Sequence, residues 1–394
     1  MTETVLVLTS AQRVLSVAVA ALLALAAGGA QASRTEPELT AAATVLPSVG
    51  PSPLSQAAAP FDAAPVPAAL EPPPAAPAAP EAAPALAAAS PAGPIPAPPE
   101  PPQAGCPVPK RPGSKPYVPK PLPPPAVADA ELPAPLPAGP KAASLDTVAG
   151  KGIWVTNWPN AQVDVPGIVA RTKGAGLRSI WVRTGGSRQG YYGDRVLPEL
   201  VPAAHAAGLK VVAWDFPFLS DPLRDAARAK AALDAGIDAF APDVETSAEG
   251  THATPQRVAL YLSLVRSYAG TRPIAATVPR PTPLRRKSFP YATFQPYADL
   301  FVPMVYWSCN EPGELVQQSL TELGRWLPVA PAGQAYDMGS EGGRSGLPTR
   351  AETWRFLDVA KRGGAVGASL WTIEKVGADQ FAALSDYPWD IVDR

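Results

Sequence analysis

Two acidic side chains lie one residue apart at the end of an apolar run, in the stretch GIDAFAPDVETSAEG (236–250). If this run is a β-strand, Asp243 and Glu245 point to the same face, because side chains alternate along a strand. Two carboxylates held close together raise the pKa of at least one of them, and partial burial acts in the same direction. The pair would then combine a protonated acid with an ionised carboxylate, which is what cleavage of a glycosidic bond requires.

The same spacing also fits a purely structural role. Asp243 or Glu245 could form an ion pair with Arg183 or another cation at a strand end, without any chemistry. In retaining enzymes with a carboxylate nucleophile, the two acids lie about 5 to 5.5 Å apart and usually come from different strands. A pair on one strand better fits substrate-assisted cleavage, in which a 2-acetamido group of the sugar attacks and one acid orients it.

Eight strand-like runs recur from residue 151 onward, mostly 25 to 35 residues apart. They cover residues 152–158, 177–184, 209–216, 237–245, 272–279, 299–307, 326–337 and 365–374. Nearly continuous apolar strands that alternate with helices indicate a parallel sheet covered on both faces. Eight strand–helix units in about 245 residues match the usual size of a (β/α)8 TIM barrel, an α/β fold. A doubly wound sheet fits less well, because no Gly-rich phosphate loop follows the first run.

The segments between these runs carry helix signals. In SDPLRDAARAKAALDAG (220–236), Ser220 or Asp221 is a candidate N-cap, a proline stands in the first turn, and Gly236 suits a left-handed residue after the last turn. Glycines at 176, 208 and 270 end the preceding segments in the same way. The segment 280–298 contains too many prolines for a long helix.

The carboxyl ends of barrel strands form the active face of TIM-barrel enzymes. Here these ends are polar, acidic and rich in aromatic residues, which is typical of sugar recognition, although any one tryptophan could equally belong to the core. The candidate substrate-binding residues are Asn157, Trp158, Arg183, Trp214, Asp215, Tyr306, Gln334, Tyr336, Asp337 and Trp371.

The acidic stretch resembles the fourth-strand signature D-x-x-D-x-D-x-E of the family 18 chitinase-type barrels. Asp238, Asp243 and Glu245 match that signature, and Ala241 stands where its middle aspartate would be. The resemblance implies that Glu245 is the proton donor and that Asp243 positions the acetamide group. It also implies a TIM barrel that hydrolyses an N-acetylated polysaccharide.

Two further stretches carry the same resemblance. PMVYW (303–307) is similar to the sixth-strand M-x-Y-D, with Trp307 in the place of the aspartate, and SLWTIE (369–374) puts Trp371 where that family has its final-strand tryptophan. GIWVTNW (152–158) is similar to the opening G-I-D-V-S-x-W of the family 25 lysozyme-type barrels, with Trp154 in the place of the aspartate. Uncharacterised bacterial glycosyl hydrolase domains share KGIWVT-like and PMVY stretches. These resemblances agree on the barrel and on D-x-E, and they disagree on the substrate.

The first 146 residues differ in composition from the rest. They hold 33 of the 53 prolines, whereas all nine tryptophans lie at or after Trp154. Residues 1–32 have the apolar core and the small-x-small motif of a signal peptide, which could be cleaved or remain as an anchor. Residues 33–146 are expected to be a disordered Pro/Ala-rich linker. The folded barrel is therefore assigned to residues 147–394.

Other classes of chemistry are less well supported. The formal net charge of −1 gives no case for nucleic acid as a partner. His205 and His252 form no metal-ligand pattern, and neither a metal nor another cofactor is expected. Cys106 and Cys309 could form a disulfide or remain two thiols.

The sequence thus predicts a secreted or surface-tethered, monomeric glycoside hydrolase. Its expected substrate is a polysaccharide, with N-acetylated cell-wall or chitin-like polymers as the suggested class. The alternative is a non-catalytic glycan-binding or cell-wall-associated scaffold, because Ala241, Trp307 and Trp154 occupy places where a related enzyme carries an acid.

Overall fold

The computed structural model describes residues 121–159, 162–341 and 343–389. The expected signal peptide, most of the expected linker and Cys106 lie outside the described residues. Cys309 is disulfide-bonded. Among the described residues, no helix is both long and apolar enough to span a membrane.

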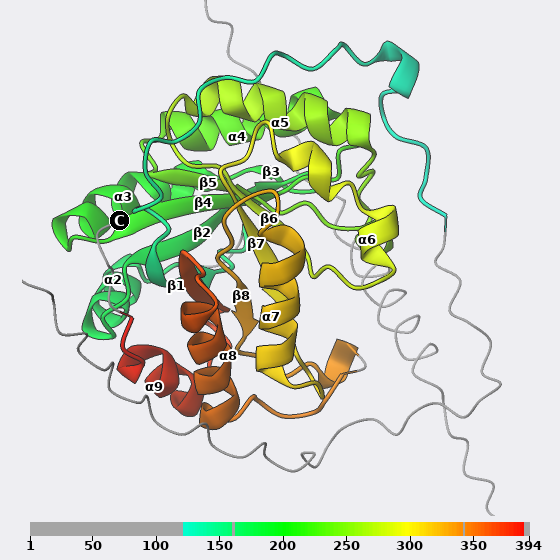
Figure 1. Ribbon diagram of the computed structural model, residues 1–394. Coiled ribbons are helices and arrows are strands. Elements are labelled where there is room, and N and C mark those ends of the chain that lie inside the picture. The colour runs from blue at the N-terminus through cyan, green and yellow to red at the C-terminus, as the bar shows by residue number, and fades with distance from the viewer. Residues whose placement is uncertain (1–120, 160–161, 342, 390–394) are drawn as a thin grey trace, which may run out of the picture. The chain divides into compact units, whose positions relative to one another are not determined.

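Eight parallel strands form the centre of the molecule, as Figure 1 shows, and their order is β5-β4-β2-β1-β9-β8-β7-β6. They are β1 (Gly150–Val155), β2 (Ser179–Gly186), β4 (Lys210–Phe216), β5 (Ala239–Pro242), β6 (Ala275–Pro279), β7 (Leu300–Val305), β8 (Ala332–Gln334) and β9 (Gly367–Trp371). Two isolated parallel bridges, Phe240 to Ile274 and Asp243 to Thr277, join the ends of this series. The sheet is therefore a nearly closed barrel, and the fold predicted from the eight apolar runs is confirmed.

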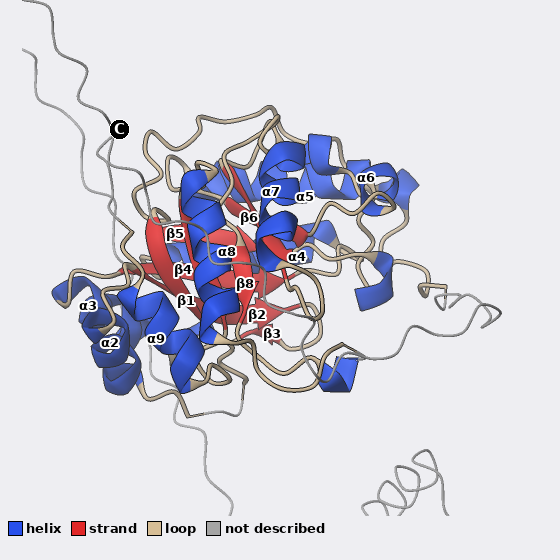
Figure 2. Ribbon diagram, turned by 60° about the horizontal axis from the view of Figure 1, so that its bottom comes forward, coloured by secondary structure: helices blue, strands red, loops and turns tan. Residues whose placement is uncertain are grey.

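Helices surround the strands (Figure 2). They are α2 (Val165–Gly174), α3 (Leu197–Ala206), α4 (Pro222–Asp234), α5 (Pro255–Ala269), α6 (Arg285–Ser288), α7 (Pro312–Leu323), α8 (Arg350–Arg362) and α9 (Ala378–Asp386). The expected end signals of α4 are confirmed: the Asp221 side chain accepts a hydrogen bond from the Arg224 amide, and Gly236 has a φ of +86°. The Pro-rich segment after β6 forms no long helix, as predicted, but only the four-residue α6 and a short 3-10 helix at Tyr291–Phe294.

Tryptophan side chains fill one side of the barrel interior. Trp154 stacks on Trp181 with ring centroids 4.7 Å apart, and Trp214 packs edge-on against Trp154 and Trp371 at 5.7 and 5.1 Å. Small residues of other strands fill the same core, namely Ala239, Ala241, Ala275, Ala330 and Ala332. Large side chains opposite small ones give a dense interior rather than a channel.

Residues 121–146, which composition assigned to the linker, follow an extended path on the outside of the barrel beside α5 (Figure 1). We call this segment the strap. Arg257 of α5 is 1% exposed and donates to the Val127 carbonyl at 2.5 Å, and it also pairs with Asp129 at 2.7 Å. Arg266, also 1% exposed, donates to the Pro140 carbonyl and forms an ion pair with Asp299. Residues before 147 therefore pack against the helices of the barrel.

The strap is expected to stabilise the barrel. A chain that starts at residue 147 exposes Arg257 and Arg266 and loses their hydrogen bonds to strap carbonyls. A hydrogen bond to a charged group contributes about 1.5 to 3 kcal/mol, so the free energy of unfolding of the shortened chain should be lower by at least about 2 kcal/mol. Urea denaturation measures this, with a chain that starts at residue 121 as the control. Equal midpoints for the two chains would show that the strap adds no stability.

Candidate active site

Asp243 and Glu245 follow β5 at the carboxyl end of the barrel. Ala241 lies in the interior core, whereas Phe240 and Val244 lie in the outer core between strands and helices. The alternation of the strand, which continues to the bridge at Asp243, turns Ala241 and Asp243 inward, and Glu245 follows in the loop, close enough for the charge of Asp243 to raise its pKa. Asp243 is only 8% exposed, and its backbone amide donates to the Asp215 carbonyl at 2.9 Å. The two carboxylates thus share the barrel mouth, as their spacing in the sequence indicates.

Both acids titrate at raised pH. Burial raises the pKa of Asp243 to about 7, with further increases from Asp215 and Glu249, and Arg183 opposes this shift. Burial and the neighbouring Asp243 raise the pKa of Glu245 well above its usual range, and Arg285 opposes this shift. A buried carboxyl group next to a second carboxylate keeps its proton, because two charges in a dry site repel each other. Because the charge of Asp243 adds to the rise in the pKa of Glu245, Glu245 is the member of the pair that holds its proton to higher pH.

Arg183 lies beside the pair without forming an ion pair to either acid among the described residues. Its guanidinium carbon lies 4.5 Å from the Trp158 ring centroid and 5.0 Å from that of Trp214. Its Nε donates to the Gly185 carbonyl at 3.2 Å, and its own carbonyl accepts from Asn157 Nδ2 at 2.8 Å. The structural alternative, a salt bridge from Arg183 to Asp243 or Glu245, is not formed in this structure.

Aromatic side chains line the mouth on both sides of the acids. Trp158 is 52% exposed and, with Asn157, borders a hollow of about 570 Å³ towards α2 and α3, which neither Asp243 nor Glu245 lines. On the other side, Tyr306 and Tyr336 pack edge to face with ring centroids 5.6 Å apart. Burial raises the pKa of Tyr306, and the nearby Tyr336, Asp243 and Glu245 raise it further. Tyr306 therefore faces the carboxylate pair as a neutral hydroxyl.

The side chains of three of the expected binding residues are held by contacts within the chain. Asp215 binds Arg228 of α4 at 2.8 Å and is 1% exposed, so its side chain lies behind the barrel wall. Gln334 accepts from the Ser308 amide at 2.8 Å and donates to the Tyr336 carbonyl at 2.9 Å, which joins the loops after β7 and β8. Asp337 is exposed and accepts from the Gly339 amide at 2.7 Å. Neither the Asp215 nor the Asp337 carboxylate hydrogen-bonds the side chain of Asp243 or Glu245 among the described residues.

The structure explains the residues at 241 and 307, which depart from the family signatures, and shows what Asp238, which matches one, does in this fold. Ala241 pairs in register with Trp214, whose ring fills the interior, so a longer side chain at 241 has little room. Trp307 points outward and packs on Phe356 of α8 with centroids 5.5 Å apart. Asp238 accepts from the Val211 amide and contacts His205 and Lys210, all within 3.2 Å, at the opposite end of β5.

Two residues of the mouth were missed by sequence reasoning. Thr277 of β6 is paired with Asp243, is 2% exposed, and its hydroxyl has no hydrogen-bond partner among the described residues. Arg285 of α6 acts on the pKa of Glu245 through its charge. A β-branched residue within a strand looks like core in a sequence, and Arg285 lies in a basic run that looks like a solvated loop. Neither carried a signal of its own.

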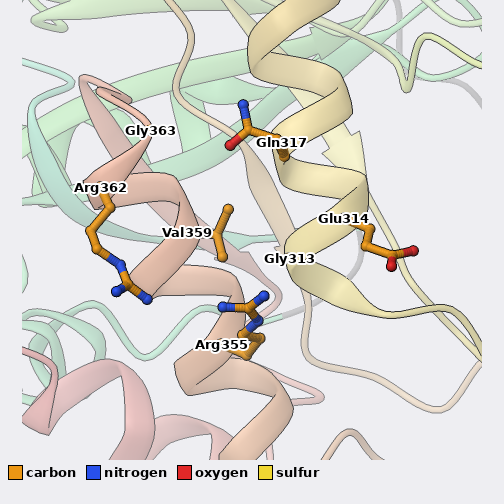
Figure 3. Close-up of a pocket in the computed structure, with 7 residues that line it drawn as sticks. All are labelled: Gly313, Glu314, Gln317, Arg355, Val359, Arg362 and Gly363. Carbon is orange, nitrogen blue, oxygen red and sulfur yellow. The ribbon is translucent and has the colours of Figure 1, made fainter. Parts of the chain in front are cut away.

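Other features of the described residues lie away from the pair. No group of three or more His, Cys, Asp or Glu side chains that could hold a metal ion occurs among them. Figure 3 shows a second hollow, of about 520 Å³, between α7 and α8 on the outer layer of the barrel. It is lined by Gly313, Glu314, Gln317, Arg355, Val359, Arg362 and Gly363.

Comparison with known proteins gives structural matches only. No protein-family model matches the sequence, and no curated protein matches it. The fold is similar to a chitinase from Rhizomucor miehei, with 15% identity, a TM-score of 0.44, and coverage of 60% of this chain and 99% of that chain. It is also similar to the spore cortex-lytic enzyme SleL from Bacillus megaterium, with 10% identity, a TM-score of 0.47, and coverage of 62% and 75%. A chitinase-like agglutinin from Robinia pseudoacacia has 10% identity, a TM-score of 0.42, and coverage of 59% and 98%.

The placement of Asp215 leads to a test of its role. Asp215→Asn removes one charge from a buried ion pair with Arg228, which typically costs about 3 kcal/mol or more of unfolding free energy. Asp337→Asn, at an exposed position, should leave the urea midpoint unchanged. Equal urea midpoints for Asp215→Asn and the wild type would instead show that the ion pair with Arg228 adds no stability.

Proposed function

We propose that this protein is a glycoside hydrolase that cleaves a polysaccharide, with Glu245 as the general acid and Asp243 as its partner. The observation that carries the proposal is the pair of carboxyl groups directly after β5, one buried and one half-buried, which both have a raised pKa and lie close enough for the charge of Asp243 to raise that of Glu245. A carboxylic acid that keeps its proton near neutral pH can protonate the leaving oxygen of a glycosidic bond. The nearby carboxylate can stabilise the positive charge that develops on the sugar.

The spacing of the two acids favours substrate-assisted cleavage. Residues i and i+2 of a strand lie about 6.6 Å apart along its axis, at roughly 3.3 Å per residue. In the proposed reaction Glu245 gives its proton to the leaving oxygen as the bond to the anomeric carbon breaks. The acetamido oxygen of the same sugar attacks that carbon, while Asp243 orients the acetamide N–H. Glu245, now ionised, then takes a proton from the water that opens the intermediate.

The rim of the mouth suits a pyranose polymer. Trp158, Tyr306 and Trp371 offer aromatic faces for the apolar faces of sugar rings, and Asn157 and Arg183 offer polar groups for hydroxyls. The proposed substrate is therefore an N-acetylated polysaccharide of the cell-wall or chitin-like class. We further propose that the protein acts as a monomer outside the cytoplasm, on the basis of the signal-like residues 1–32 and the Pro-rich residues that follow.

An alternative function is glycan binding without cleavage. Specific observations favour it: Ala241 and Trp307 replace two acids of the related signature, and Asp215 and Asp337 do not take their places. Isothermal calorimetry together with product analysis separates the two functions. Binding of chito-oligosaccharides or glycan strands with no product after long incubation would favour a binding scaffold.

The acid role of Glu245 leads to a specific mutational test. Glu245→Gln keeps the shape of the side chain but removes the transferable proton, so kcat should fall by a factor of about 10² to 10⁴. Glu314→Gln is the matched control, because Glu314 is exposed and lies on α7 in the outer layer of the barrel, away from the acid pair. Release of reducing ends from chito-oligosaccharides measures both. Full activity of Glu245→Gln would exclude Glu245 as the acid.

The coupling between the acids predicts a change in pH dependence. The rate should follow a bell-shaped pH profile whose basic limb reports loss of the Glu245 proton. The charge of Asp243 raises the pKa of Glu245, so removing it in Asp243→Asn should lower that pKa and move the basic limb to lower pH. Initial rates across the pH range test this. An unmoved basic limb in an active Asp243→Asn protein would show that the acids are not coupled.

A further inference from the structure

Two buried polar atoms lie on paired residues of neighbouring chain segments in the barrel mouth, and neither has a hydrogen-bond partner among the described residues. One is Oδ1 of Asp243, an acceptor, and the other is the hydroxyl oxygen of Thr277, a donor. Asp243 is 8% exposed and Thr277 is 2% exposed. Buried polar groups are nearly always hydrogen-bonded in native proteins, so two lone ones at neighbouring positions call for an explanation.

The geometry of β5 and β6 brings these side chains together. Asp243 and Thr277 form a parallel bridge, and both belong to the inward-facing series of their strands. Neighbouring strands lie about 4.8 Å apart, so paired residues on one face are close neighbours. Rotation of the threonine side chain about Cα–Cβ can direct its hydroxyl towards the paired carboxylate.

Oδ1 of Asp243 receives no hydrogen bond from the other polar groups around it among the described residues. Ala241, two residues earlier on the same face, has no polar group. Besides Glu245 on its own segment, the charged or titratable groups around Asp243 come from five other places in the chain: Arg183 of β2, Asp215 of β4, Glu249 of the following loop, Tyr261 of α5 and Tyr306 after β7. Among the described residues, none of these donates a hydrogen bond to Oδ1. Thr277 is the neutral donor paired with Asp243 across the sheet.

We propose that Thr277 is a positioning residue, whose hydroxyl donates a hydrogen bond to Oδ1 of ionised Asp243 and so orients this carboxylate beside Glu245. Its significance for catalysis rests on the proposed hydrolase function, whereas the hydrogen bond itself does not. In this role Thr277 supplies from β6 the support that Ala241 cannot give from β5. A hydrogen bond to the ionised form of a carboxyl group lowers its pKa.

The test compares Thr277→Val with Thr277→Ser in the full chain. Valine keeps the shape of threonine without the hydroxyl, and serine keeps the hydroxyl. Carbon-13 NMR of protein labelled at the aspartate carboxyl carbon follows the titration of Asp243, with Asp243→Asn identifying its signal. We expect the lower apparent pKa of the acid pair to rise by about one pH unit in Thr277→Val and to return close to the wild-type value in Thr277→Ser.

The outcomes separate this inference from the proposed function. An unchanged titration of Asp243 in a folded Thr277→Val protein would overturn the hydrogen bond, whether or not the protein cleaves glycans. If the wild type is active, the acidic limb of the rate profile should move to higher pH in Thr277→Val, with about a tenfold loss of kcat at low pH. A wild type with no activity on any glycan would overturn the hydrolase function, while the NMR titration would still decide the role of Thr277.

Discussion

Two carboxyl groups lie close together at the carboxyl end of β5, and the candidate site depends on this constraint. Asp243 faces the barrel interior and Glu245 follows it in the loop, and burial leaves little water to screen a charge on either of them. The repulsion is relieved when one of the two keeps a proton. A carboxyl group that holds its proton to raised pH is therefore a consequence of residue spacing and burial.

Packing of the interior explains which acids this barrel lacks. Four tryptophans, at 154, 181, 214 and 371, occupy the space inside the sheet. A barrel of fixed diameter holds only a limited side-chain volume. Large rings on β1, β2, β4 and β9 therefore require small residues on the strands opposite, and Ala241 meets that requirement. Alanine at 241 and tryptophan at 154 therefore belong to the same packing arrangement of the barrel interior.

The sequence allowed the barrel to be predicted, and it allowed only part of the site to be predicted. Apolar runs at regular intervals are a property of every strand–helix unit, so eight of them were sufficient to identify the architecture. The site depends on which side of the wall each strand-end residue faces, and strand ends often shift by a residue or two. Asp215 follows Trp214 directly and therefore points outward to Arg228, and Thr277 points inward although it resembles core.

The strap shows a different limit of composition. A Pro-rich segment without tryptophan cannot form a core of its own, yet its backbone carbonyls are acceptors that two buried arginines of α5 can use. Its contacts follow α5 from Arg257 through Ser263 to Arg266. A mechanical pull on the chain from the N-terminal side therefore meets these contacts before it reaches β1. A force applied at residue 121 is therefore carried first by α5 through the strap, and only after the strap detaches does it act on the first strand of the barrel.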